Sequence, residues 1–242
     1  MALFRPNVEK LKANRDIDGL LKALEDKKDR VRSEAAKALG EIGGTIPMPK
    51  FGIVMVKLVD TFEDKSDEVR DAVSNALGKI GAPAVQPLLS AVQIKQSMPV
   101  FVGAESALAM IGAPAVEPII GTLIGAPDPL GGFATQTLTR IGALAVDPLL
   151  ASLKENDLEK SEHVIWILGK IGKKLADRVL RKRILETLIP LTGPMQFVKN
   201  PTAEDRNKLK IAAGASVALQ EIAGEDFGMH PDKWMEWMKK QR

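Results

Sequence analysis

Apolar residues recur along this chain at the three- and four-residue spacing of amphipathic helices. In the stretch 67–80, Val69, Val73, Leu77 and Ile80 fall on one side of a helix and polar residues on the other. Comparable patterns occupy 6–24, 29–42, 53–62, 173–189 and 204–222, and a shorter one occupies 231–240. The pattern predicts helices throughout, so we expect an all-α protein.

An Ile-Gly pair closes this helical pattern at a nearly fixed interval. Its glycine stands at positions 43, 81, 112, 142 and 172, so the steps are 38, 31, 30 and 30 residues. Self-similarity at such a period indicates stacked helical pairs rather than one compact fold. We predict a single-domain α-solenoid, a right-handed superhelix of about six helical pairs with a short capping helix at the C-terminus. The predicted repeats are 6–43, 53–81, 83–112, 114–142, 144–172 and 173–224, and the cap is 225–242.

The second helices of the first two repeats open alike. Residues 29–32 (DRVR) match residues 67–70 (DEVR), and we expect Asp29 and Asp67 to cap their helices. The arginine that follows, Arg32 or Arg70, can reach an aspartate of the neighbouring repeat and form a ladder of ion pairs. The ladder stops there, because the next repeats hold Phe101, Gly131 and Ser161 at this position.

Proline marks the first helices of the third, fourth and fifth repeats. Each contains a second proline within the helix, where the missing N–H removes a backbone hydrogen bond. We therefore expect a bend in each helix, which would curve the stack. The residues concerned are Pro87, Pro118 and Pro148.

Two insertions and a cap interrupt the repeat. Residues 45–52 lengthen the first step, and we predict an extended loop over 190–201. In the final helix, Trp234, Trp237 and Met238 are spaced to form one apolar stripe. A terminal repeat has no neighbour to cover it, so this helix is expected to cap the array.

Composition excludes several kinds of chemistry. The chain has no cysteine, which removes disulfides, thiolate nucleophiles and cysteine zinc sites, and it has only two histidines, His163 and His230. No phosphate loop or nucleophile elbow occurs, so we expect no catalytic residue, no metal and no cofactor. The net charge of +3 does not imply a polyanionic partner by itself. Without a membrane-spanning apolar segment, we expect a cytoplasmic protein.

Three motifs recur in register between repeats. They are Val-Arg at 31–32 and 69–70, Ala-Leu-Gly-Glu/Lys-Ile-Gly at 38–43 and 76–81, and Pro-Ala-Val-Xaa-Pro-Leu/Ile at 83–88 and 114–119. They resemble HEAT repeats, specifically the HEAT-like repeats named after phycobilisome lyases. The resemblance implies an armadillo-like solenoid that acts as a non-catalytic scaffold for another protein. It leaves open a role as an accessory subunit of a bilin-lyase-like enzyme.

The second helices of HEAT-like stacks line a concave groove, which is our preferred site for a partner protein. Two rows of outward positions would form its floor. One row holds Lys37, Asn75, Ser106, Gln136 and Trp166, and the other holds Ser33, Asp71, Val102, Gly132 and Glu162. From these rows we select Lys37, Asp71, Asn75, Ser106, Gln136, Glu162 and Trp166 as partner-binding residues. Trp166 is the natural anchor, unless the following repeat buries it.

Basic residues gather in the stretch 173–189. Lys174, Arg178, Arg181 and Lys182 recur at helical spacing and should share one face of a helix. Most such stripes are simply solvated outer faces. The alternative is a nucleic-acid contact, in which these side chains would neutralise phosphates.

Overall fold

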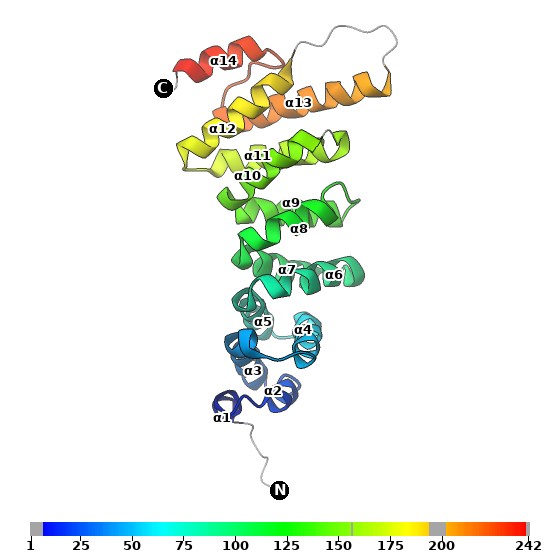
Figure 1. Cartoon of the computed structure of the whole chain (residues 1–242), viewed down its shortest axis with the longest axis vertical. Helices are drawn as coiled ribbons and strands as arrows, with labels where there is room; N and C mark the ends of the chain where they lie inside the picture. The colour runs from blue at the N-terminus through cyan, green and yellow to red at the C-terminus, as the bar shows by residue number, and fades with distance from the viewer. Residues whose placement is uncertain (1–6, 156, 194–201, 241–242) are drawn as a thin grey trace. The chain divides into compact units, whose positions relative to one another are not determined.

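The computed structural model describes residues 7–155, 157–193 and 202–240. Over these residues the chain consists of α-helices joined by turns and short 3-10 helices, with no strand (Figure 1). The predicted all-α solenoid class is confirmed. The chain divides into two compact units, residues 1–119 and 120–242. The single domain and the right-handed superhelix stay predictions.

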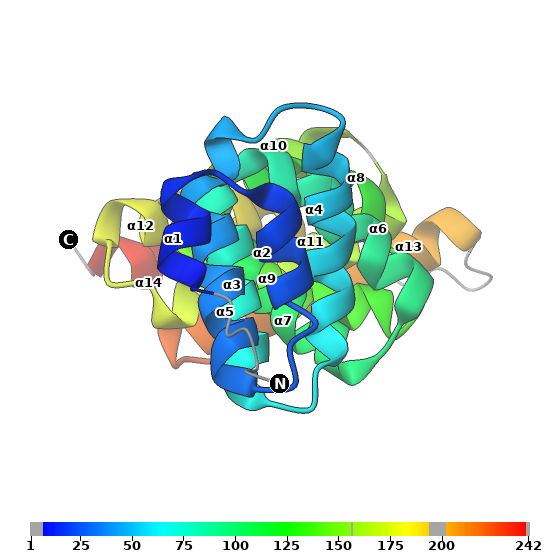
Figure 2. The ribbon, with the colours of Figure 1, turned by 90° about the horizontal axis from the view of Figure 1, so that it is seen from below.

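Unit 1 is a two-layered stack of helices. Its helices are α1 (Val8–Ala13), α2 (Ile17–Ala23), α3 (Asp29–Ile42), α4 (Lys50–Asp60), α5 (Asp67–Ile80), α6 (Val85–Lys95) and α7 (Met98–Ile111). The second helices of the pairs, α3, α5 and α7, pack side by side in chain order. The first helices, α2, α4 and α6, form the other layer, as Figure 2 shows for α2 and α4 beside α3 and α5.

Unit 2 repeats this arrangement. Helix α8 (Ala113–Leu123) crosses the division, and α9 (Leu130–Ile141), α10 (Ala143–Ser152), α11 (Leu158–Lys174), α12 (Arg178–Leu188), α13 (Ala203–Ala223) and α14 (Pro231–Lys240) follow. The second helices α9, α11 and α13 are neighbours, and α10 contacts α12 in the other layer. Helix α14 is the predicted C-terminal capping helix. It packs on the short helix η5 (Ile189–Thr192).

Small residues bring neighbouring second helices into close contact. A Cβ atom added to Gly40 on α3 would lie 2.5 Å from the Cα atom of Ala76 on α5. A Cβ atom on Gly169 of α11 would lie 2.9 Å from the Cα atom of Ala218 on α13. Because backbone atoms stand opposite each glycine, neither position has room for a side chain.

We expect the substitution Gly40→Ala to lower the free energy of unfolding of unit 1 by about 1–3 kcal/mol, because the new methyl group forces α3 and α5 apart. Gly52→Ala on α4 is the matched control, since no atom lies within 4 Å of its added Cβ. Alanine in a helix normally stabilises, so the control should gain up to about 1 kcal/mol. Urea denaturation followed by circular dichroism measures both. Equal changes in the two variants would contradict the close contact.

The predicted helix over residues 6–24 is two helices in the structure. It breaks between α1 and α2, where Arg15 has a φ of 50° in the left-handed region. Asp16 then caps α2, because its Oδ1 accepts the Gly19 N–H at 2.9 Å. Pro6 lies outside the described residues.

The predicted aspartate caps are also wrong. The N-cap residues of α3 and α5 are Lys28 and Ser66, and neither cap has a side-chain hydrogen bond. Asp29 and Asp67 are instead the first helical residues. A carboxylate in the first turn still stabilises the helix through the helix dipole.

One rung of the predicted arginine ladder exists. Arg32 on α3 donates from Nε and Nη2 to the two carboxylate oxygens of Asp64, at 2.6 and 2.7 Å, in the following repeat. Arg70 forms no such rung, because its guanidinium bonds within its own repeat, to the Asp64 carbonyl and to Asp67. The ladder therefore ends one repeat earlier than the sequence suggests.

Proline and insertion segments agree in part with expectation. Helices α8 and α10 continue through Pro118 and Pro148, and the expected bends stay predictions. Helix α4 begins at Lys50, three residues before the predicted start. The predicted loop 190–201 starts with η5, and residues 194–201 lie outside the described residues.

Candidate functional site

Unit 1 carries four of the predicted groove residues on successive second helices. Lys37 is on α3, Asp71 and Asn75 are on α5, and Ser106 is on α7. The first three are exposed and Ser106 is half-buried. Lys37 Nζ lies 3.9 Å from Glu68 Oε1, and Asn75 Nδ2 donates to the Asp71 carbonyl at 2.8 Å. These side chains form a polar strip over α3 and α5.

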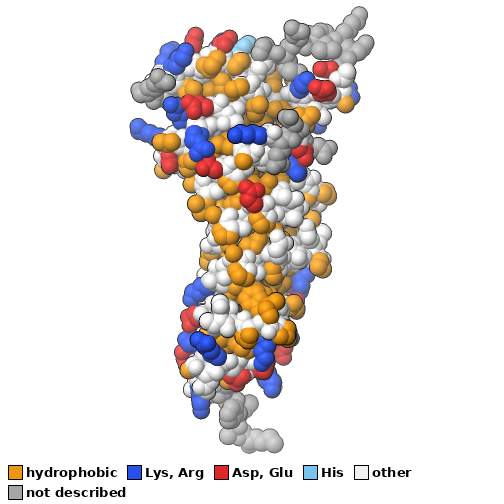
Figure 3. All heavy atoms as spheres, in the orientation of Figure 1, with side chains coloured by type: hydrophobic (Ala, Val, Ile, Leu, Met, Phe, Trp, Pro, Cys, Tyr) orange, Lys and Arg blue, Asp and Glu red, His pale blue; other side chains and the backbone are white. Residues whose placement is uncertain are grey.

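The second predicted row differs at its first member. Ser33 is fully buried and donates to Glu68 Oε1 at 3.1 Å, so it cannot contact a partner. Val102, in the same row on α7, is 57% exposed. Figure 3 shows charges gathered over the N-terminal helices of unit 1, whereas hydrophobic and uncharged side chains cover its α6 and α7.

Unit 2 carries the other three groove residues. Gln136 on α9 and Glu162 and Trp166 on α11 are all exposed. The exposed fraction of Trp166 is 48%, so the following repeat does not bury the indole. At the equivalent place on α13 stands Val217, which is 51% exposed. Two large apolar side chains are thus presented to solvent by neighbouring helices.

An ion pair between helices supports Trp166. Lys170 Nζ, one turn along α11, lies 5.4 Å from the centroid of the Trp166 ring. The same ammonium group is 2.6 Å from Glu221 Oε1 on α13. Because Glu221 fixes the lysine and the lysine covers one face of the indole, the orientation of Trp166 is restricted.

Trp166 also borders a pocket of about 660 Å³ within unit 2. The loop 125–128 between α8 and α9 forms one side, and Glu162, His163 and Trp166 of α11 form another. Gly131, at the start of α9, also lines the pocket, and its added Cβ would lie 2.4 Å from the Ala126 carbonyl oxygen. Glycine at this position therefore lets the loop fold onto α9. We call this the Trp166 pocket.

The charge of the Trp166 pocket is acidic. Two carboxylates, Asp128 and Glu162, line it, and neither lysine nor arginine is among its described lining residues. Within the described part of the chain, no group of three or more His, Cys, Asp or Glu could hold a metal ion. Carboxylates beside an indole attract organic cations.

The predicted basic helix 173–189 is divided in the structure. Lys174 ends α11, and α12 begins only at Arg178. Leu175 is extended, with φ −75° and ψ 119°, and Asp177 accepts the Val179 N–H at 2.8 Å. This cap starts a new helix and separates Lys174 from the other basic residues.

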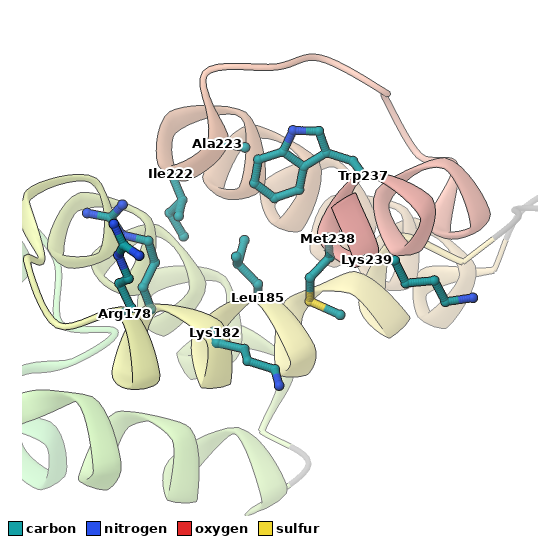
Figure 4. Close-up of a pocket in the computed structure, with 9 residues that line it drawn as sticks. Arg178, Lys182, Leu185, Ile222, Ala223, Trp237, Met238 and Lys239 are labelled. Carbon is teal, nitrogen blue, oxygen red and sulfur yellow. The ribbon is translucent and has the colours of Figure 1, made fainter. Parts of the chain in front are cut away.

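The remaining basic residues line a second pocket in unit 2. Arg178, Arg181 and Lys182 of α12 border a cavity of about 470 Å³ between α12, α13 and α14 (Figure 4). We call it the α14 pocket. The prediction of one solvated stripe missed it, because α14 comes from a distant part of the sequence.

No helix of the described chain has the length and apolarity that crossing a lipid bilayer would require.

Known proteins resemble the chain in its repeats. Residues 17–109 match the family model of HEAT repeats, so the predicted resemblance is confirmed there. None of the curated proteins matches the chain.

Several solved structures are similar. An archaeal HEAT-like repeats protein from Thermococcus onnurineus NA1 has 15% identity and a TM-score of 0.36, covering 87% of this chain and 91% of its own. The CpcE–CpcF complex of phycocyanin lyase from Nostoc sp. PCC7120 has 20% identity and a TM-score of 0.34, covering 97% and 85%.

Proposed function

We propose that this chain, with HEAT repeats over residues 17–109, is a non-catalytic scaffold that binds another protein through the exposed face of its second helices. The observation that carries the proposal is the exposed Trp166 beside its pocket on unit 2. Large aromatic side chains next to a pocket are the usual anchors of protein interfaces.

The contacts that Lys170 makes with the indole of Trp166 and with Glu221 favour a binding role for this exposed side chain. These contacts restrict the orientation of the ring before any partner arrives. Preorganisation of this kind lowers the entropy cost of association. Val217 beside it extends the apolar surface that a partner would cover.

The charges of the pocket indicate what the partner presents. Asp128 and Glu162 face a cavity large enough for an extended side chain. An arginine or lysine of the partner would pair with these carboxylates and lie against the indole. We therefore infer a partner segment with a basic side chain at its centre.

We expect the substitution Trp166→Ala to weaken partner binding by at least about 2 kcal/mol, roughly 30-fold in Kd. Glu162→Gln should weaken it less, because the shape is kept and only one charge is removed. The partner would be captured with the native chain from lysate of its host, treated with nuclease, and its Kd measured by calorimetry. Val179→Ala is the control, since this 69% exposed valine lies on α12, away from the pocket.

Each outcome decides between functions. A protein that survives nuclease treatment, binds the control variant and is lost with Trp166→Ala supports the scaffold. Material recovered only without nuclease would overturn it in favour of nucleic-acid binding. A captured protein with equal Kd for all three variants would place the interface elsewhere.

A further inference from the structure

We propose that the α14 pocket is a second binding site, which takes an acidic peptide segment with a bulky apolar side chain at its centre. The site is separate from the Trp166 pocket, because none of their lining residues is shared. It therefore does not rest on the scaffold function proposed above.

The floor of the α14 pocket is apolar. Leu185 of α12, Ile222 of α13, and Trp237 and Met238 of α14 line it, and Figure 4 shows their side chains converging from three helices. Its volume of about 470 Å³ is in the usual range for ligand sites. The apolar floor of a cavity of this size can accept a leucine or phenylalanine side chain of a bound segment.

Basic side chains flank this apolar floor on two opposite sides. Arg178 and Lys182 extend from α12, and Lys239 extends from α14 (Figure 4). No described carboxylate forms an ion pair with Arg178 or Lys239, and none lines the pocket. Lys182 Nζ lies 3.5 Å from Glu186 Oε1, a loose pair on the same helix with both side chains about half exposed. These charges are complementary to carboxylates on both sides of an apolar anchor.

One cation is fixed in place. Arg181 lines the pocket and donates from Nη2 to the Leu175 carbonyl oxygen. Its positive charge therefore stays at the pocket whether or not a ligand is bound. A fixed charge costs less side-chain entropy on binding than a mobile lysine.

The wall made by α14 is also rigid. Trp237 stacks edge-on against Trp234, with ring centroids 6.2 Å apart. Trp234 is fully buried and donates from Nε1 to the Gly228 carbonyl at 2.8 Å. The pocket is thus preformed, as small-molecule and peptide pockets usually are.

An acidic peptide fits these features better than a nucleic acid. Phosphates could contact Arg178, Lys182 and Lys239, but a sugar–phosphate backbone would leave Leu185 and Met238 uncovered. A peptide places carboxylates and an apolar side chain within a few residues of each other. Its recognition depends on both kinds of contact, and that double dependence can be measured.

The test uses three fluorescein-labelled peptides of about twelve residues, a length that spans a pocket of this class. The first has phenylalanine flanked by glutamates, the second has serine in place of phenylalanine, and the third has lysines in place of glutamates. Fluorescence anisotropy with the full chain should show binding of the first only, weakened at least about tenfold by either change. A labelled single-stranded oligonucleotide is the fourth probe.

Charge-reversal variants locate the binding. Arg178→Glu combined with Lys182→Glu should weaken the first peptide at least about tenfold. Lys173→Glu combined with Lys174→Glu is the matched control, because these exposed lysines end α11 and do not line the pocket. The control should change Kd less than about twofold, and circular dichroism should show the same helix content in both variants.

Other results would overturn the proposal. Equal losses of affinity for the first peptide in the pocket and control variants would mean that the peptide is attracted by the general positive charge of this region and not by the pocket. Equal binding of the phenylalanine and serine peptides, or oligonucleotide binding that needs Arg178 and Lys182, would exclude an apolar anchor. If the first peptide does not bind, the α14 pocket is not a site for acidic peptides. Trp166→Ala should leave this binding unchanged, so failure here is distinct from failure of the scaffold.

Discussion

Replacing Asp64 with alanine is expected to lower the free energy of unfolding of unit 1 by about 3–5 kcal/mol, the usual cost of breaking a buried ion pair. The side chains of Arg32 and Asp64 are only 8% and 12% exposed. Without the carboxylate, two guanidinium donors of Arg32 lose their acceptors inside the stack. Among the described residues, the Asp26 carbonyl oxygen, 2.9 Å from Nη1, is the acceptor that remains for this side chain.

Urea denaturation followed by circular dichroism measures this loss. Glu25→Ala is the control, because its 2.6 Å ion pair with Lys57 is largely exposed, and solvent-exposed pairs contribute little to stability. The double variant Arg32→Met, Asp64→Leu should recover most of the stability, because it leaves no unpaired charge. A loss with Asp64→Ala no larger than with Glu25→Ala would contradict the role of the buried pair.

The pH dependence gives an independent reading of the same pair. Burial acts to raise the pKa of Asp64, but hydrogen bonds from Arg32 and the Ser66 N–H, with the charge of Arg32, hold it below its usual value. A carboxyl group with a depressed pKa stabilises the fold above its unfolded pKa of about 3.9, and this contribution is lost as pH falls through the folded pKa. The difference between the native chain and Asp64→Ala should therefore be constant near neutral pH and shrink below about pH 4.

Trp234→Ala should detach the C-terminal cap and cost about 3–5 kcal/mol in unit 2, as large aromatic truncations in cores do. Trp234 is fully buried, its ring centroid lies 4.9 Å from that of Phe227, and its Nε1 has a carbonyl partner. No other side chain of α14 is as deeply buried. Without it, the contact between α14 and η5 loses its buried aromatic side chain.

Hydrogen exchange read by mass spectrometry tests this loss. Peptides covering α14 should exchange faster by several orders of magnitude, whereas those from α3 and α5 should be unchanged, because repeats interact mainly with their neighbours. Met235→Ala is the control on the same helix, where the side chain is 42% exposed. Equal exchange in the two variants would show that the cap does not depend on Trp234.

The sequence predicts the repeats because an Ile-Gly pair recurs in them. In three of the second helices this pair ends the helix, whereas α11 continues through Gly172 to Lys174. Helices α5, α7 and α9 each end at the isoleucine of the Ile-Gly pair, and Gly81, Gly112 and Gly142 have positive φ. The break at Arg15 has no comparable signal. An arginine in the left-handed region is uncommon, so its neighbours and not its own preference place it there.

The candidate sites depend on contacts that periodicity does not contain. Helical spacing places Trp166 on the outward side of α11, but only the spacing between α11 and α13 decides whether the indole is exposed. The ion pair from Lys170 to Glu221 follows from the repeat register, since the two residues hold equivalent positions on neighbouring helices. The sequence does not predict that the loop 125–128 forms one side of the pocket, because glycine and proline there indicate only a turn. The α14 pocket joins residues far apart in the sequence.

The joints at Gly81, Gly112 and Gly142 have φ values of 79°, 71° and 70° and ψ values of −143°, −129° and −124°. The chain thus leaves three successive second helices along nearly the same path, whichever repeat comes next. A repeat added or removed at such a joint meets the backbone geometry that it had before. The number of repeats can therefore change at these joints without a change in the backbone path through the joints that remain.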